Sequence, residues 1–265
     1  MEKISATVIT FNEEEQIGEC IDSLWLVADE VIILDSFSTD RTVSIAEEKG
    51  AIVKQAPFTG YIEQKNKALS LANYNYVFSL DADERVSKKL AASILKAKKD
   101  FKFPAYFMNR YNNYCGRFIK HGLWYPNKKL RLFDKRIAQW GGTNPHDKVV
   151  LSSNAAAGLL KGDIIHYTYN SVEEHRRRNE ELCNIAAKAI FNSGKQKHWT
   201  KIFLSPAWSF IHGYFIRLGF LDGYRGFVIA VMTANQSYLK YHKLRLLQRK
   251  EKQQISRTSM IKIGE

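Results

Sequence analysis

The sequence has few cysteines, no long apolar run and fewer acidic than basic residues. Its three cysteines, Cys20, Cys115 and Cys183, are odd in number and lack metal-ligand spacing, so we expect reduced thiols. No apolar run reaches the roughly 20 residues of a membrane-spanning helix. Met1 leads directly into an apolar strand, so we expect no secretion signal and an intracellular protein.

The glycine-rich motifs of common nucleotide-binding folds are missing too. No Gly-x-Gly-x-x-Gly follows the first predicted strand, and no Gly-Lys-Ser/Thr phosphate loop is present. An aspartyl-phosphate phosphatase would carry acids after that strand, where this chain has Thr10 and Asn12. Dinucleotide binding, P-loop chemistry and that phosphatase chemistry are therefore disfavoured.

The charge balance is strongly basic. Over 265 residues, 40 Lys and Arg against 27 Asp and Glu give a net charge of +13. The fraction of hydrophobic residues, 45%, is that of an ordinary globular protein. Such a charge indicates an anionic partner, which could be nucleic acid, acidic lipid or a phosphorylated substrate.

The first half alternates apolar strands with helical segments, which predicts an α/β fold with parallel pairing and right-handed crossovers. We expect strands at 3–10, 30–35, 51–55 and 76–80 and helices at about 15–27, 40–48 and 62–72.

Polar clusters at 10–13, 35–40 and 81–84 each follow one of these strands, so a parallel sheet would bring them to one edge. Asp81 and Asp83, two positions apart, could hold one divalent cation there. The alternative is a solvated turn that opens the helix starting near Ser87. The convergence of three clusters favours a binding site.

Several motifs resemble a known family. VITFNEE at 8–14, LDSFSTDRT at 34–42 and LDADE at 80–84 are similar to signatures of the inverting, nucleotide-sugar-dependent glycosyltransferases with the GT-A fold. In the second half, KLRLF at 129–133, PHD at 145–147, IHY at 165–167 and RLGFLDG at 217–223 resemble the lipopolysaccharide-core branch, often described as β-1,4-glucosyltransferases.

The resemblance implies a GT-A fold, meaning a Rossmann-like, mostly parallel sheet with flanking helices, followed here by a helical C-terminal region. It also implies a UDP-hexose donor such as UDP-glucose, Mg²⁺ or Mn²⁺, and a lipid-linked or phosphorylated saccharide acceptor. The nucleotide-sugar residues it implies are Thr10, Asn12, Glu13, Asp35, Asp40, Gln64, Lys65, Asp81 and Arg131. Gln64 and Lys65 could instead lie on a solvated helix face.

The resemblance also implies that Asp83 ligates the metal, with Asp81 contacting the metal, its water or the ribose. His166 is a further candidate ligand, although a lone histidine after a strand is more often only hydrogen-bonded. Inverting transfer needs a base for the acceptor hydroxyl, and a carboxylate suits that role. In the family that the chain resembles, an acid of the second half supplies this base, and the resemblance thereby implies Asp147, with His146 and Glu84 as alternatives. The Gly-rich approach and Pro145 predict that Asp147 lies in a shaped loop.

The second half changes character after residue 168. We expect a helix at 171–191, capped by Ser171, whose arginines at 176–178 lie on a solvated or an anion-binding face. The aromatics at 207–216 and the apolar residues at 227–234, beside many basic residues, indicate either a segment lying on an anionic membrane or a core helix pair with a solvated tail. We therefore expect a catalytic domain at 1–168, a membrane-associating region at 169–250 and a disordered tail at 251–265.

Together these features predict an enzyme on the inner face of the cytoplasmic membrane. Two alternatives are a nucleotidyltransferase on the same fold and a basic nucleic-acid-binding protein. Against the latter, the acids occupy the predicted sheet edge and no nucleic-acid motif is present, so we expect no nucleic-acid partner.

Overall fold

The computed structural model describes residues 2–143, 146–152, 155–194 and 199–263, with only the backbone at 146, 252 and 254–263. The chain forms two compact units. The first comprises Met1–Lys120 and Trp124–Thr168, and the second comprises His121–Leu123 and Tyr169–Glu265. Each unit is described by itself.

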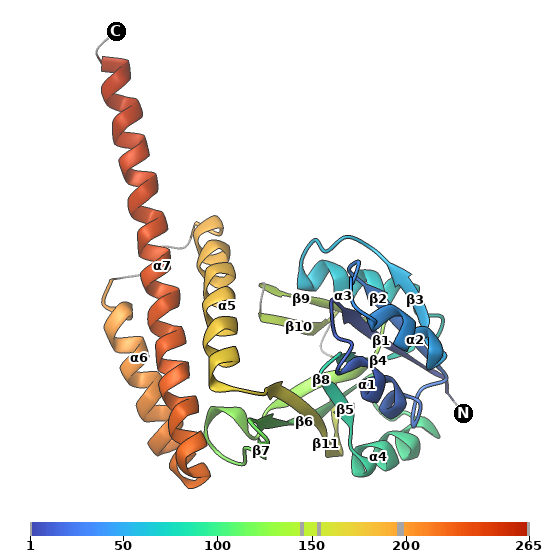
Figure 1. Cartoon of the computed structure of the whole chain (residues 1–265). Coiled ribbons are helices and arrows are strands. Elements are labelled where there is room, and N and C mark those ends of the chain that lie inside the picture. Colours follow the sequence, from blue (N-terminus) through green and yellow to red (C-terminus); the bar gives the residue numbers. More distant parts are fainter. Residues whose placement is uncertain (1, 144–145, 153–154, 195–198, 264–265) are drawn as a thin grey trace. The chain divides into compact units, whose positions relative to one another are not determined.

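The first unit begins with a parallel β-sheet in the order β3-β2-β1-β4 (Figure 1). Its strands are β1 (Ile4–Thr10), β2 (Glu30–Asp35), β3 (Ile52–Gln55) and β4 (Tyr76–Asp81). The connecting helices are α1 (Ile17–Leu24), α2 (Thr42–Glu48) and α3 (Tyr61–Leu71). This half confirms the predicted alternation and parallel pairing.

The same sheet continues with further strands, which include the strand predicted at 129–133. In the order β4-β8-β6-β11-β5, the pairs β4–β8, β8–β6 and β11–β5 are antiparallel, so the sheet is mixed. The elements are β5 (Glu84–Val86), α4 (Lys88–Lys98), β6 (Ala105–Tyr114), β7 (Arg117–Phe118), the 3₁₀ turn η1 (Gly122–Trp124), β8 (Lys128–Asp134) and β11 (Ala157–Tyr169). A separate hairpin pairs β9 (Ala138–Thr143) with β10 (His146–Leu151). Between β6 and β11 the described residues contain no α-helix that could carry the chain across the sheet, and strands joined by short connections pair antiparallel.

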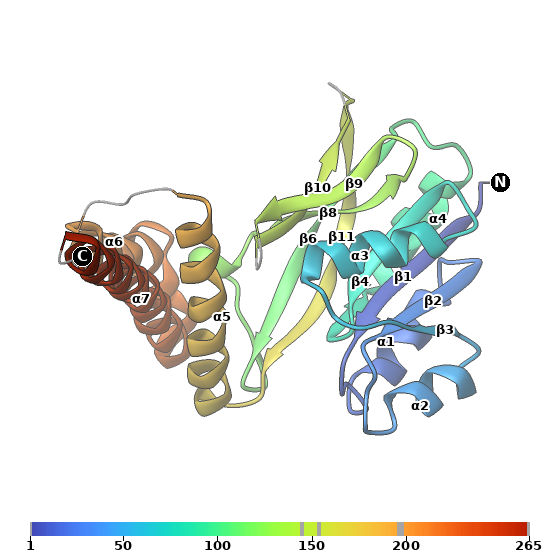
Figure 2. The same cartoon turned by 90° about the horizontal axis from the view of Figure 1, so that it is seen from above.

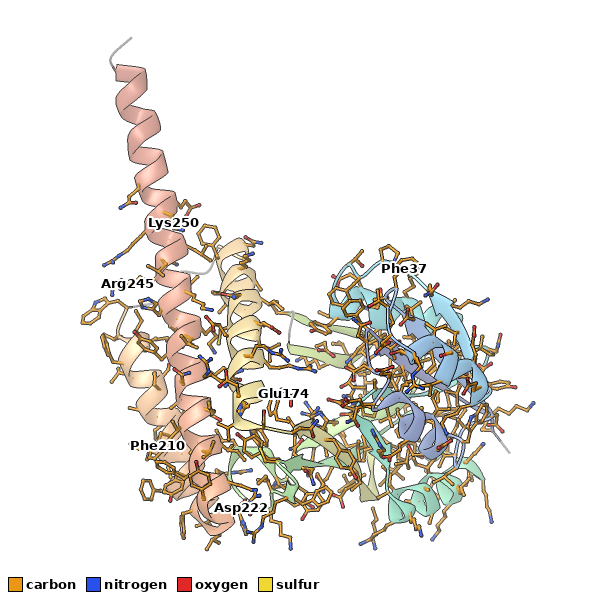
Figure 3. All side chains as sticks on the ribbon, in the orientation of Figure 1. Phe37, Glu174, Phe210, Asp222, Arg245 and Lys250 are labelled. Carbon is orange, nitrogen blue, oxygen red and sulfur yellow. The ribbon has the colours of Figure 1, made fainter. Side chains whose placement is uncertain are left out.

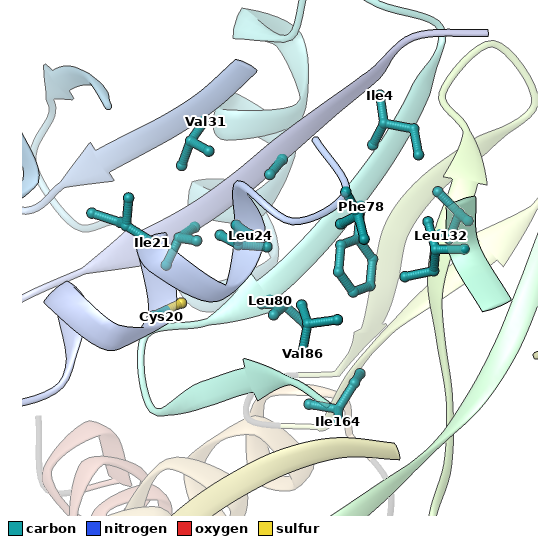
Figure 4. Close-up of a cluster of buried hydrophobic side chains, with 14 of the residues drawn as sticks. Ile4, Cys20, Ile21, Leu24, Val31, Phe78, Leu80, Val86, Leu132 and Ile164 are labelled. Atoms are coloured by element: carbon teal, nitrogen blue, oxygen red, sulfur yellow. The ribbon is translucent and has the colours of Figure 1, made fainter. Parts of the chain in front are cut away.

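The core between α1 and the sheet is apolar and buried. Ile17, Ile21 and Leu24 form one face of α1 and pack with Phe78 and Leu80 of β4. All five side chains are inaccessible to solvent, and burying each contributes about 1.5–3 kcal/mol. Figure 4 shows Ile21, Leu24, Phe78 and Leu80 of this cluster. The carboxyl end of β4 therefore packs on a fully buried apolar core.

The second unit is helical. It contains α5 (Val172–Asn192), α6 (Lys201–Ile211), the π-helical turn η2 (His212–Ile216), the 3₁₀ turn η3 (Gly219–Asp222) and α7 (Gly223–Ile263). The views in Figures 1 and 2 show α7 lying along both α5 and α6. Ser171 caps α5 as predicted, because its Oγ accepts from the Glu174 amide at 3.1 Å.

The last part of α7 departs from the sequence prediction. Residues 251–263 continue the helix, where the sequence predicted a disordered tail from 251. The stretch is rich in Lys, Arg, Glu and Gln, which have good helix propensity. Within the described residues, no helix is long and apolar enough to cross a membrane.

The motif at 217–223 forms a tight corner between η2 and α7. A Cβ added at Gly226 would lie 1.9 Å from the Gly219 carbonyl oxygen, so the backbones touch there. His121 donates its amide hydrogen to Asp222 Oδ2 at 2.8 Å, and Gly122 donates to the Arg217 carbonyl at 2.8 Å. The motif thus has a structural role within the second unit.

Candidate active site

The three polar clusters meet at one edge of the sheet, as the sequence predicted. Strand β1 lies between β2 and β4 and runs parallel to both. In register, Thr10 pairs with Asp35 and Ile9 pairs with Asp81. The loops that follow these strands therefore share the carboxyl-end edge, where ligands of open α/β sheets bind.

The loops after β1 and β2 hold each other through side-chain hydrogen bonds. Asp35 is fully buried and accepts from Thr10 Oγ1 at 3.1 Å and from the Ser38 amide at 2.8 Å. Asn12, in the left-handed region with φ 54°, accepts from the Thr39 amide at 2.8 Å. These residues shape the edge by fixing its backbone.

Asp40 continues this network one turn later. It accepts from the Glu14 amide at 3.1 Å and from the Thr42 amide at 3.0 Å, while Glu13 donates its amide hydrogen to Thr42 Oγ1 at 2.7 Å. Burial opposes the charge of Asp40, but these hydrogen bonds hold its pKa below the ordinary value. Residues 10–14 and 35–42 thus form an ordered rim along this edge of the sheet.

Two aromatic side chains project from this rim. Phe11 follows β1 and is 57% exposed. Phe37 follows β2 and is 53% exposed (Figure 3). Phe37 has φ 62°, an unfavourable conformation for a bulky residue that the surrounding hydrogen bonds maintain. Sequence reasoning did not single out either ring.

Helix α3 brings two buried polar side chains to the edge, and neither lies on a solvated face. Gln64 donates from Nε2 to Ser36 Oγ at 3.1 Å and so ties the helix to the loop after β2. Lys65 Nζ lies 2.7 Å from both Asp81 Oδ1 and Asp147 Oδ2. Its ammonium also lies 4.4 Å from the ring centroid of Trp140. Lys65 thus joins β4 to the β9–β10 hairpin.

Asp81 is held between two cations. Its Oδ2 accepts from Arg131 Nη2 at 2.7 Å, in addition to the Lys65 contact. Burial alone would raise its pKa, but the charges of Arg131 and Lys65 hold the pKa of Asp81 well below the ordinary value. Asp81 is therefore ionised at neutral pH.

Glu84 is fully buried directly behind Asp81. Its Oε1 accepts from Arg110 Nη1 and Arg131 Nη2, each at 3.2 Å, and its Oε2 accepts from the Asp81 amide at 3.0 Å. Both carboxylate oxygens are engaged and neither reaches solvent. This arrangement suits a residue that positions Asp81 and the two arginines, and it disfavours Glu84 as the base.

Asp83 and His166 form the second acidic element of the edge. His166 Nε2 lies 3.1 Å from Asp83 Oδ2, and His166 Nδ1 lies 2.7 Å from Asn112 Oδ1. Asn112 donates from Nδ2 to the Trp124 carbonyl at 2.8 Å, which turns Oδ1 towards the ring. Nδ1 can therefore donate to Asn112, and Nε2 is the ring nitrogen that faces the Asp83 carboxylate, where it can serve as a hydrogen-bond donor or as a metal ligand.

This pair fits a divalent cation such as Mn²⁺ or Mg²⁺. A carboxylate oxygen and an imidazole nitrogen 3.1 Å apart can both ligate one ion. In the described part of the chain, no three His, Cys, Asp or Glu side chains gather to hold a metal by themselves. Water and substrate phosphate oxygens would complete the coordination.

Comparisons with known proteins agree with this geometry. Residues 5–152 match the family described as Glycosyl transferase family 2. The chain belongs to glycosyl transferase family 2. It is 34% identical to an uncharacterized glycosyltransferase of Rickettsia felis over 97% of this chain and 95% of that protein. It is 26% identical to the lipopolysaccharide core biosynthesis glycosyltransferase LpsC of Rhizobium meliloti over 90% of this chain and 93% of LpsC.

The fold of this family 2 glycosyltransferase also has a solved neighbour. The structure of glucosyl-3-phosphoglycerate synthase from Mycobacterium tuberculosis with Mn²⁺, UDP and glucosyl-3-phosphoglycerate aligns with a TM-score of 0.50 at 18% identity. The alignment covers 74% of this chain and 81% of that one. It supports the predicted GT-A fold.

In this glycosyltransferase, Asp147 lies on strand β10 opposite Gly142 of β9. The segment is a β-hairpin, where the sequence predicted a shaped loop. Residues 144 and 145 lie outside the described part, as does the side chain of His146. The Asp147 side chain is 15% exposed, and Oδ2 contacts Lys65. Among the described residues Oδ1 has no hydrogen-bond partner, so it can accept a proton.

Four further residues of the site escaped the sequence analysis. They are Arg110, Asn112, Lys129 and Trp140, all from the antiparallel strands and the hairpin. No motif marks Arg110, Asn112 or Trp140, and the motif that contains Lys129 assigned it no role, because antiparallel pairing decides which of the many polar residues of these strands face the edge. Only the alternation in 129–133 indicated that Arg131 faces away from its apolar neighbours.

Proposed function

We propose that this enzyme is a metal-dependent inverting hexosyltransferase. It would move a sugar from a UDP-hexose such as UDP-glucose to a lipid-linked saccharide of the lipopolysaccharide core, as a member of the β-1,4-glucosyltransferase branch. The observation that carries the proposal is the pairing of Asp83 with His166, next to the Lys65-linked acids Asp81 and Asp147. The similarity to LpsC supports the acceptor class.

The donor nucleotide would occupy the rim. Phe11 and Phe37 offer exposed aromatic faces on which a base can stack. The loop backbone fixed by Asn12, Asp35 and Asp40 borders the ribose. Asp83 and His166 would hold a divalent metal that neutralises the charge of the departing diphosphate.

Asp147 would act as the general base. Its Oδ1 takes the proton from the acceptor hydroxyl while Lys65 fixes Oδ2, so the carboxylate is oriented by a charge-assisted hydrogen bond. Lys65 is itself positioned by Asp81 and by the Trp140 ring. This chain of contacts links the base to the acid that follows β4.

The Asp83→Ala variant tests the donor site. Calorimetric affinity for UDP in the presence of Mn²⁺ should fall at least tenfold, about 1.4 kcal/mol, because half of the protein's metal ligands is lost. Asp100→Ala, at an exposed position away from the sheet edge, is the matched control and should bind like the unaltered protein.

Unchanged UDP affinity of Asp83→Ala in Mn²⁺ would refute the metal assignment. Product analysis with UDP-glucose distinguishes the reaction class, since glycosyl transfer releases UDP. Release of inorganic diphosphate instead would indicate a nucleotidyltransferase.

The second unit would bind an anionic membrane surface. Exposed apolar side chains recur at helical spacing along α6 and η2: Phe203, Leu204, Trp208, Ile211 and Phe215, each between 46% and 66% exposed. Helix α6 packs on α7 with its other face. A soluble helix normally buries its apolar stripe, so this exposed stripe suits insertion into a lipid interface.

The charge of this region complements acidic lipid. Residues 182–250 contain 11 Lys and Arg but one acid, Asp222. His121 donates its backbone amide hydrogen to that acid, which is therefore occupied within the unit. Arg245 and Lys250 lie along α7 (Figure 3). A basic, aromatic surface of this kind favours the inner face of the cytoplasmic membrane.

Vesicle flotation tests the membrane surface. Leu204→Glu and Trp208→Glu should each weaken binding to anionic vesicles, while Leu159→Glu, an equally exposed leucine on β11, should not. Lys201→Glu should cost on the order of 1 kcal/mol, and binding should weaken as salt rises. Flotation that is insensitive to salt and to both α6 substitutions would contradict the proposal, and so would stronger binding to nucleic acid at matched salt.

A further inference from the structure

Strands β6 and β8 place three cations close together behind the acidic edge. Arg110 comes from β6, and Lys129 and Arg131 come from β8. Their acidic partners are fewer. Glu84 Oε1 forms ion pairs with both arginines, and Asp81 forms ion pairs with both Arg131 and Lys65.

The pairing of the two strands explains the cluster. Met108 lies opposite Lys129, and Arg110 follows Met108 by two residues, so Arg110 and Lys129 share one face of the sheet. Tyr106 pairs with Leu132 and Phe107 with Leu130, which leaves Arg131 as the extra residue of a β-bulge. Bulges next to active sites redirect side chains, and here the bulge brings the Arg131 guanidinium to Asp81 and Glu84.

In the part of the chain that the structure describes, several donors of this cluster have no hydrogen-bond partner. Arg131 is 4% exposed, yet its Nε and Nη1 are buried without a hydrogen bond, and Arg110 Nε is in the same situation. Among the described residues the Lys129 side chain makes no hydrogen bond and no ion pair. Burial and the charges of Arg110 and Arg131 lower the pKa of Lys129 to about 8, as expected for a cation lacking a counter-charge.

We propose that Arg110 and Lys129, together with Arg131, bind a phosphate group carried by the saccharide acceptor. The inference rests on the proposed function and names the acceptor class more closely, as a phosphorylated saccharide. A phosphate would accept from the unpaired guanidinium donors and supply the missing negative charge. The donor diphosphate would find its positive partner elsewhere, in a divalent metal held by Asp83 and His166.

The test uses the full-length protein loaded with UDP and Mn²⁺. We would titrate it with a hexose 6-phosphate and with the same hexose lacking the phosphate, by calorimetry. Lys129→Gln removes a charge without breaking any described side-chain contact, and it should weaken hexose 6-phosphate binding at least tenfold while UDP affinity stays within about twofold. Lys128→Gln, the exposed neighbour on the same strand, is the control and should leave both affinities unchanged.

Arg110→Lys provides a second variant, because it keeps one charge but loses the planar guanidinium, and it should weaken the same binding. An equal loss of UDP affinity in Lys129→Gln would assign the cluster to the donor diphosphate and overturn the proposal. Equal affinity for the hexose and its phosphate in the unaltered protein would also overturn it.

Failure of the proposed function is a separate result. If UDP does not bind with Mn²⁺, inorganic phosphate titrated into the free protein still reports on the cluster. Tenfold weaker phosphate binding by Lys129→Gln than by Lys128→Gln would then support the phosphate site. Equal binding by the two variants would overturn it.

Discussion

Replacing Lys129 by methionine should stabilise the protein at neutral pH. The ammonium is partly buried on β8 and is repelled by Arg110 and Arg131, and the folded state bears the cost of its charge. Methionine keeps a similar length and removes that charge. A substitution that stabilises the fold but weakens phosphate binding would show that Lys129 is retained for function at the expense of stability.

The magnitude follows from the pKa. Lowering the pKa from the ordinary value of 10.5 to about 8 corresponds to about 3 kcal/mol, at about 1.4 kcal/mol per pH unit. Partial exposure to water screens part of this, and methionine forgoes the weak attraction of Glu84 and Asp81. We therefore expect Lys129→Met to raise the free energy of unfolding by about 1–3 kcal/mol at pH 7.

The pH dependence has a defined sign. The unfolded chain keeps Lys129 protonated up to about pH 10.5, whereas the folded protein loses that proton above about pH 8. Between these values the unfolded state binds more protons, so the unaltered protein gains stability as pH rises. The advantage of Lys129→Met should be constant below about pH 8 and should shrink towards zero as pH approaches 10.5.

Urea unfolding of both proteins at several pH values between 7 and about 10 measures this difference. Lys128→Met, at the exposed neighbour, should change stability by less than about 0.5 kcal/mol at every pH. A Lys129→Met protein that is no more stable at pH 7, or whose advantage does not decline with pH, would refute the reasoning.

Two further predictions concern the proposed general base, Asp147, and the close contact between Gly219 and Gly226. Asp147→Asn should lower kcat by about 10² to 10⁴ while the donor KM stays nearly constant, because the carboxylate that accepts the proton is lost but the donor site is intact. Near-normal turnover of Asp147→Asn beside an inactive but folded Glu84→Gln would transfer the role to Glu84. Gly226→Ala should cost about 1–3 kcal/mol in urea unfolding, because its Cβ would meet the Gly219 carbonyl oxygen at 1.9 Å. Gly18→Ala, where the nearest atom is the flexible end of Lys49, should be neutral or stabilising, and an equal loss in both variants would contradict the steric argument.

The parallel half of the fold could be predicted because its signals are local. Strands β1, β2 and β4 are each a short apolar run followed by polar residues, and the helices between the strands force parallel pairing. The same logic correctly predicted that Thr10, Asp35 and Asp81 lie at one edge of the sheet. Periodicity and connection length sufficed for these elements.

The antiparallel half could not be predicted in this way. Its pairings depend on which distant strand offers a matching register, and one residue of slip turns every side chain to the other face. The bulge at Arg131 is such a departure, and it decides that Arg131 meets Asp81. The positions of Arg110 and Lys129 follow from the same register, and no local pattern carries that information.

Asp81 and Asp83 belong to one Asp-x-Asp motif, but their different contacts indicate different roles. Asp81 ends β4 with both oxygens engaged by cations, Oδ1 by Lys65 and Oδ2 by Arg131. Asp83, in the turn, faces a histidine whose ring is oriented by Asn112. A divalent ion would meet an available ligand pair at Asp83, whereas at Asp81 it would have to displace two protein charges. Asp81 is therefore better suited to fixing Lys65, and through it Asp147, so that one motif serves both the metal and the base.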